Sequence, residues 1–168
     1  DVVLAFQKIA SKISAKLLMI GDGPERGAAE EMCRKIGLCN QIVFLGNQNP
    51  VEEIYSVGDL FLIPSESESF GLSAVEAMSC GVPVISSNAG GLGEINVDGK
   101  TGYVCEIGDV ESMGEKGIYI LEDLERWEQF SRNARERALE FSENKIVPLY
   151  EAYYTKILEK NKTTTLQN

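Results

Sequence analysis

Residues 59–86 read DLFLIPSESESFGLSAVEAMSCGVPVIS, and this stretch decides the fold class. The short apolar runs at 59–63 and 82–86 are typical of strands buried on both faces, because neither run alternates with polar residues. Between them, residues 72–80 are expected to form a helix that Gly81 ends. Two strands with a helix between them predict a parallel pair, since parallel strands need a long crossover connection.

The same pattern extends along the chain in both directions. Alternating apolar strands and helices predict an α/β fold with a doubly wound parallel sheet. Strands are also expected at 16–20, 41–45 and 101–106, a glycine-rich turn or short helix at 90–96, and helices at 1–13, 25–36, 50–57, 109–122, 125–141 and 144–160, before a frayed polar tail at 161–168.

The composition excludes several kinds of function. The chain has 168 residues, a formal net charge of −10 and no histidine. Histidine-based catalytic triads and metal sites are therefore excluded for these residues, and we expect no metal site. Such an acidic chain is not expected to bind nucleic acid or an acidic membrane surface. With neither an 18-residue apolar run nor a signal peptide, we expect a cytoplasmic protein whose natural start lies upstream of Asp1.

The cysteines indicate no special chemistry. Cys33, Cys39, Cys80 and Cys105 form no C-x-x-C pair, and their spacing matches neither a zinc site nor a redox motif. Two of them lie in apolar segments, where a cysteine packs as a small hydrophobic side chain. We therefore expect four reduced thiols.

The ligand site is expected at the carboxyl ends of the strands, in loops that lead into helices, as in other doubly wound sheets. The candidate loops are 21–25, 65–72 and 88–94. The first has Arg26 where the dinucleotide pattern G-x-G-x-x-G needs glycine, so we interpret it as a tight strand-to-helix turn and not as an NAD site.

The loop at 65–72 has the features of an anion site. Gly71 lets the backbone approach a ligand closely, and the free N–H groups at the following helix start can hold a phosphate without lysine or arginine. Glu68 precedes this helix and Glu76 lies about one turn inside it. Because carboxylates accept hydrogen bonds strongly from hydroxyls, the spacing suits a ligand of sugar, diphosphate and ribose. The alternative is that Glu68 is merely solvated and the helix dipole favours Glu76.

The pattern Glu68-x7-Glu76, with SFGLSAV inside it and AMSCGVPVI after it, resembles the family-four retaining glycosyltransferases of GT-B fold. The similarity covers about residues 1–140. It implies the Rossmann-like C-terminal half of a GT-B enzyme, with a donor-binding domain at 1–142 that lacks its first strand, then a helix at 143–160. The supporting motifs are GDGPE at 21–25, VFLG at 43–46, PS at 64–65, GG at 90–91 with Glu94, and DG at 98–99 with Gly102.

The resemblance also implies a role for each site residue. Glu76 would bind the ribose hydroxyls of UDP. Glu68 would be the catalytic residue by contacting hydroxyls of the transferred sugar, and it is not assigned as a nucleophile. The other donor-binding residues would be Ser69, Phe70, Gly71 and Leu72 at the diphosphate and sugar, and Gly46 and Asn47 beside the uracil.

Narrower motifs at 65–72 and 101–109 resemble members that transfer N-acetylglucosamine from UDP-GlcNAc to L-malate in bacillithiol biosynthesis. The resemblance implies a small-molecule donor and acceptor, no further cofactor, and an absent N-terminal domain that holds the acceptor pocket and any catalytic histidine. It also implies that the basic residues for the diphosphate lie on the strand before Asp1. The isolated chain is then expected to be inactive, and a homo-oligomer is left open. Gly93 departs from the proline usual in this family.

Three alternatives are kept. The chain belongs to another family-four enzyme with a polysaccharide or glycolipid acceptor, it is a non-catalytic module that binds a nucleotide sugar, or it is an α/β domain with a decayed site.

Overall fold

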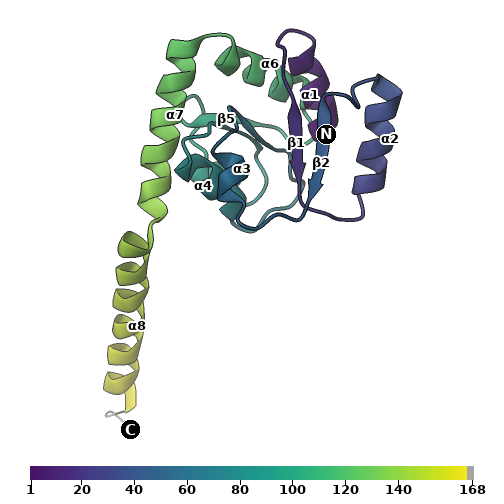
Figure 1. Ribbon diagram of the computed structural model, residues 1–168. Coiled ribbons are helices and arrows are strands. Elements are labelled where there is room, and N and C mark those ends of the chain that lie inside the picture. Colours follow the sequence, from purple (N-terminus) through teal and green to yellow (C-terminus); the bar gives the residue numbers. More distant parts are fainter. Residues whose placement is uncertain (166–168) are drawn as a thin grey trace.

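Strands and helices alternate along the chain as expected (Figure 1). The computed structural model describes the backbone of residues 1–165 and the side chains of residues 1–158. The elements are α1 (Val2–Ala10), β1 (Leu17–Ile20), α2 (Arg26–Ile36), β2 (Ile42–Gly46), α3 (Glu52–Tyr55), β3 (Phe61–Ile63), α4 (Leu72–Ser79), β4 (Val84–Ser87), α5 (Leu92–Ile95), β5 (Gly102–Cys105), α6 (Val110–Leu121), α7 (Leu124–Ala138), the 3-10 helix η1 (Leu139–Phe141) and α8 (Glu143–Thr165).

The five described strands pair in parallel but form two separate sheets. β1 pairs with β2, beginning with Leu17 opposite Ile42, while β3, β4 and β5 pair in that order. The α/β class and the parallel pairing are confirmed, whereas the expected continuous sheet is divided between β1 and β3. These two strands line a common apolar groove instead of sharing a hydrogen-bonded ladder within the described chain.

Helices cover both faces of the sheet formed by β3, β4 and β5. Phe61, Ile63 and Val84 pack with residues of α4, α5 and α7. Leu62 and Ile85, which point to the opposite face, pack with residues of α1 and α6. Burial on both faces explains why these strands are uninterrupted apolar runs, and it confirms the doubly wound arrangement.

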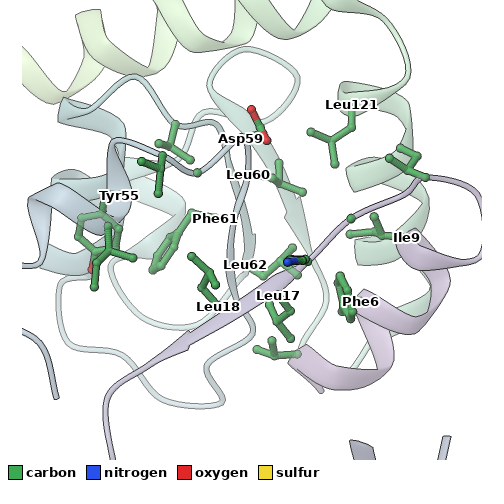
Figure 2. Close-up of a pocket in the computed structure, with 18 of the residues that line it drawn as sticks. Phe6, Ile9, Leu17, Leu18, Tyr55, Asp59, Leu60, Phe61, Leu62 and Leu121 are labelled. Carbon is green, nitrogen blue, oxygen red and sulfur yellow. The ribbon is translucent and has the colours of Figure 1, made fainter. Parts of the chain in front are cut away.

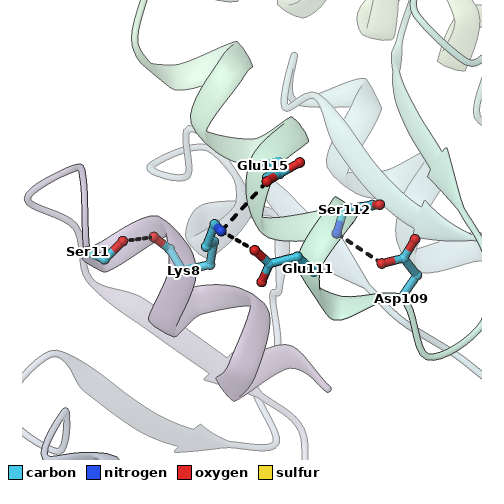
Figure 3. A network of polar contacts seen from close by, with 6 residues as sticks. All are labelled: Lys8, Ser11, Asp109, Glu111, Ser112 and Glu115. Atoms are coloured by element: carbon cyan, nitrogen blue, oxygen red, sulfur yellow. Dashed lines mark hydrogen bonds and ion pairs between the residues drawn. The ribbon is translucent and has the colours of Figure 1, made fainter.

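A small polar network fastens α1 to α6 (Figure 3). Lys8 pairs with Glu111, and its Nζ lies 3.6 Å from the carboxylate of Glu115. At the start of α6, the carboxylate of Asp109 accepts a hydrogen bond from the N–H of Ser112 at 3.0 Å, as an N-cap residue does. Hydrogen bonds from the side chain and backbone of Ser112 lower the pKa of Asp109 below its ordinary value of 3.8.

The expectation of four reduced thiols is wrong for one pair of cysteines. Cys33 and Cys39 are joined by a disulfide across a Cα–Cα distance of 5.2 Å, while the other two cysteines are free. Gly37 ends α2 with a φ of 77°, as expected, and the N–H of Leu38 then donates to the carbonyl of Cys33 at 3.1 Å. This reversal brings Cys39 back to the last turn of the helix, which cysteine spacing alone does not indicate.

The C-terminal helices differ from the expected ones at two places. The helix expected over 125–141 ends at Ala138 and continues as the 3-10 helix η1. α8 runs through the segment expected to fray as far as Thr165, and residues 166–168 lie outside the described residues. α8 extends away from the rest of the molecule (Figure 1). None of the described helices has the length and apolar character needed to cross a membrane.

Candidate functional site

The loops that follow β3 and β4 meet at the carboxyl edge of their sheet, as expected for neighbouring parallel strands. Their backbones touch: a side chain on Gly90 would overlap with the carbonyl group of Glu68, and one on Gly91 would lie 3.0 Å from the carbonyl oxygens of Ser69 and Phe70. The structure therefore brings the expected loops 65–72 and 88–94 together into one surface.

The start of α4 forms the centre of this surface. Gly71 precedes the helix with a φ of 94°, and a Cβ at this position would lie only 2.7 Å from Cδ2 of Leu92. A residue with a side chain fits neither this backbone conformation nor this space. No side chain caps α4, so the N–H groups of Leu72 and Ser73 in its first turn are available to an anion, while the N–H of Ala74 donates to the carbonyl of Gly71 at 3.0 Å.

Buried polar side chains fasten the site loops to the sheet, Ser87 at the loop 65–72 and Asn96 at the end of α5. Ser87, at the end of β4, donates from its hydroxyl to the carbonyl of Ser65 at 2.5 Å. The side-chain amide of Asn96 donates to the carbonyls of Val84 and Tyr103 at 3.0 and 2.9 Å. Sequence reasoning did not identify these residues, because serines and asparagines near glycine-rich turns carry no distinctive pattern.

The two candidate carboxylates differ in their surroundings. Glu68 is half-buried, and its Oε1 accepts a hydrogen bond from the N–H of Ser69 at 3.1 Å. Glu76 is exposed and lies in the second turn of α4, where the helix dipole has little effect. It is near Tyr55, whose pKa is raised mainly by burial and further by the charge of Glu76. The dipole alternative therefore explains Glu76 poorly.

Gly46 and Asn47 belong to the other sheet, where the loops after β1 and β2 meet. The N–H of Gly21 donates to the carbonyl of Gly46 at 2.7 Å. Nη1 of Arg26 lies 3.7 Å from where a side chain on Gly46 would begin, and the guanidinium pairs with Glu30 at 2.9 Å. The sequence pattern indicates Arg26 only as a departure from the dinucleotide motif, whereas the structure places its guanidinium beside this loop.

Two cavities lie near the expected site in the described part of the chain, and neither contains all of it. A groove of about 970 Å³ separates β1 from β3 and is lined by apolar side chains, among them Phe6, Leu17, Leu18 and Leu62 (Figure 2). A smaller hollow of about 330 Å³ between α4 and the end of α7 includes Leu72 and Glu76, but not Glu68 or Gly46. Among the described residues, no three cysteine, aspartate or glutamate side chains gather as a metal site would require.

Comparison with known proteins identifies the family. Residues 1–137 match the family described as Glycosyl transferases group 1. The chain belongs to this family. The expected glycosyltransferase family is confirmed. A side chain on Gly93 would meet no atom within 4 Å, so the turn at 90–94 has room for the proline that is usual at this position in the family.

This group 1 glycosyltransferase chain is similar to N-acetyl-alpha-D-glucosaminyl L-malate synthase of Bacillus anthracis. The two are 42% identical over 163 residues, which is 96% of this chain and 43% of that protein. The chain thus spans less than half the length of this curated relative.

Solved structures confirm the fold. The C-terminal domain of a group 1 family protein, LpcC from Francisella tularensis, matches with a TM-score of 0.74 at 25% identity, over 86% of this chain and 78% of that one. The pneumococcal O-GlcNAc transferase GtfA, solved in complex with UDP and GlcNAc, matches with a TM-score of 0.82 at 21% identity, over 94% of this chain and 32% of that one. This group 1 glycosyltransferase chain therefore has the Rossmann-like fold of a GT-B C-terminal domain.

Proposed function

We propose that this chain is the donor-binding half of a retaining glycosyltransferase that transfers N-acetylglucosamine from UDP-GlcNAc to L-malate. The observation that carries the donor assignment is the uncapped start of α4, which follows Gly71 and lies between Glu68 and Glu76 in the sequence. The choice of donor sugar and acceptor rests on the 42% identity to the malate synthase. Since both substrates are small metabolites, the proposed location is the cytoplasm.

In this proposal, the first-turn N–H groups of α4 bind the diphosphate. Glu76 accepts hydrogen bonds from the ribose hydroxyls, and Glu68 accepts them from hydroxyls of the N-acetylglucosamine ring. The backbone of residues 69–72 lies along the diphosphate and sugar, and Gly46 with Asn47 borders the uracil. The donor is held by backbone dipoles because residues 65–72 contain two glutamates and no cation.

The proposed reaction replaces one bond at the anomeric carbon by another. The malate hydroxyl attacks this carbon from the face on which the bond to the UDP oxygen breaks, and its proton passes to that departing oxygen. Because attack and departure share one face of an oxocarbenium-like state, the configuration is retained. Glu68 acts by holding the sugar ring as positive charge develops on it, and not as a covalent nucleophile. The donor itself needs no further cofactor in this scheme.

The groove between β1 and β3 supports the view that the chain acts as part of a longer enzyme. Both strands lack a neighbour on the groove side within the described chain, and the groove is apolar. We propose that a parallel strand from the longer protein occupies it and that the acceptor pocket and the cations facing the diphosphate lie outside this chain. Unpaired backbone groups of buried strand edges are costly, so such a strand would stabilise both sheets.

Two experiments test the proposed function. Calorimetry with UDP should give weak binding to the isolated chain without transfer activity, and an absence of binding at millimolar UDP would contradict the donor site. With the full-length enzyme, UDP release from UDP-GlcNAc should depend on L-malate. Release that instead requires a glycolipid or polysaccharide acceptor favours another member of the family, and UDP-GlcNAc binding without release under any acceptor favours a binding module.

A further inference from the structure

Arg137, in the last turn of α7, holds the end of α5. Its Nε donates to the carbonyl oxygen of Ile95 at 3.2 Å, and its Nη2 donates to the carbonyl oxygen of Glu94. α5 has only four residues and directly follows the loop with Gly90 and Gly91. Because a helix that short has few internal hydrogen bonds, contacts to its last carbonyls fix its position.

Phe141 connects this arginine to the other loop of the site. The guanidinium carbon of Arg137 lies 4.8 Å from the centre of the Phe141 ring. That ring meets the ring of Phe70 edge to face, with centroids 5.8 Å apart and planes at 81°. Both arrangements are attractive, the first between a cation and an aromatic face and the second between two rings. Phe70 is the residue immediately before Gly71 and α4.

The backbone contact between the loops 65–72 and 88–94 needs support from side chains outside these loops. It is made by Gly91 against Ser69 and Phe70, and glycine has no side chain that could lock the loops together. Arg137, at the end of α7, holds α5 and the loop before it through the carbonyl groups of residues 94 and 95. Phe141, in η1, holds the loop at 65–71 through the ring of Phe70. Arg137 therefore contacts the end of α5 directly and the loop of Phe70 through the ring of Phe141.

We propose that Arg137 and Phe141 are positioning residues of the donor site. Together they keep the start of α4 and the loop at 88–91 in a fixed relation, so that the first-turn N–H groups and Glu68 face the donor at once. The proposal rests on the proposed function for the identity of the donor. The contacts themselves do not depend on that identity.

The test uses the full-length enzyme with two disruptive variants, R137Q and F141L, and two conservative ones, R137K and F141Y. Lysine keeps the charge but lacks the planar fork that reaches two carbonyls at once, while tyrosine keeps the ring. R132Q is the matched control, because Arg132 lies on the same helix and its Nη1 is 3.6 Å from Glu128, not at α5.

Amide hydrogen exchange in the ligand-free enzyme is the first measurement. Exchange in residues 65–71 and 90–95 should become faster in R137Q and F141L, while R132Q and F141Y stay like the wild type. Unchanged exchange in both segments of R137Q and F141L would overturn the proposal, whatever ligand the enzyme binds.

Steady-state kinetics are the second measurement. In R137Q the KM for UDP-GlcNAc should rise about tenfold, which corresponds to about 1.4 kcal/mol, while the KM for malate stays unchanged. R137K should lie between R137Q and the wild type. A lower melting temperature with equal changes in both KM values indicates general destabilisation and overturns the positioning role. If the wild-type enzyme does not bind UDP-GlcNAc, the proposed function fails, and the exchange measurement still decides the positioning role because it uses no ligand.

Discussion

The carbonyl oxygen of Glu68 lies in the space where a side chain on Gly90 would begin. The loop that carries the candidate catalytic glutamate thus rests directly on the backbone of the next loop. Gly90 also has a φ of 49°, in the left-handed region that side chains disfavour. The glycine pair at 90–91 consequently determines where Glu68 and the start of α4 lie.

Replacing Gly90 by alanine should displace the Glu68 loop, because the obstructing atoms are backbone and cannot rotate away. We expect a loss of stability of about 1–3 kcal/mol, as for other overpacked sites, and UDP binding at least about tenfold weaker by calorimetry. Gly93→Ala is the matched control, since a side chain there meets no atom within 4 Å. Equal UDP affinities for the two variants would contradict the importance of this contact.

Glu76→Ala should weaken the binding of UDP. A hydrogen bond to a charged group contributes about 1.5–3 kcal/mol, so the dissociation constant should rise by about one to two orders of magnitude. Glu52→Ala serves as the control, because Glu52 also lies near Tyr55 but belongs to α3. An affinity that is the same in Glu76→Ala and in the wild type would rule out the ribose contact.

Glu68→Gln should affect turnover more than nucleotide binding. In the full-length enzyme, kcat with UDP-GlcNAc should fall by about one to two orders of magnitude, because the lost hydrogen bond is strongest when charge develops on the sugar. The affinity for UDP, which has no sugar, should stay close to the wild-type value. Glu66→Gln, an exposed neighbour in the same loop, should leave both quantities unchanged. Parallel losses of turnover and UDP affinity in Glu68→Gln would argue against a sugar contact.

The disulfide between Cys33 and Cys39 can be tested by counting thiols. Protein alkylated under denaturing conditions without reductant should carry two labels, and protein reduced before alkylation should carry four. Cys39→Ser should lower the free energy of unfolding by about 2 kcal/mol, and reductant should lower that of the wild type equally. Because disulfides are rare in the cytosol, four labels on protein alkylated during cell lysis without reductant would show that the bond is open in the cell.

The sequence predicted the features that depend on local patterns. The uninterrupted apolar runs at 59–63 and 82–86 correspond to strands buried on both faces, whereas Leu18 and Val43 in β1 and β2 are exposed. Gly37 and Gly71 marked the end of α2 and the start of α4 as observed. It did not predict features that depend on distant contacts. No spacing rule encodes the separation of β1 from β3, which depends on the packing of the two sheets. Nor does one encode the Cys33–Cys39 disulfide or the hydrogen bonds from Arg137 to the end of α5.

The N-cap of α6 predicts a specific dependence of stability on pH. The pKa of Asp109 is lowered in the folded protein by hydrogen bonds from Ser112, so the folded state favours the charged carboxylate. The contribution of Asp109 to the free energy of unfolding is therefore fully present when the pH is above the ordinary pKa of 3.8. It is lost as the pH falls through the lower pKa of the folded state.

Asp109→Asn should be less stable than the wild type at neutral pH, and the difference should shrink as the pH falls below about 4. Denaturant unfolding at several pH values measures this difference. Glu31→Gln, which alters an exposed carboxylate on α2, should show no such convergence. A difference between Asp109→Asn and the wild type that stays constant from neutral to acidic pH would show that the charge of Asp109 does not act through the α6 cap.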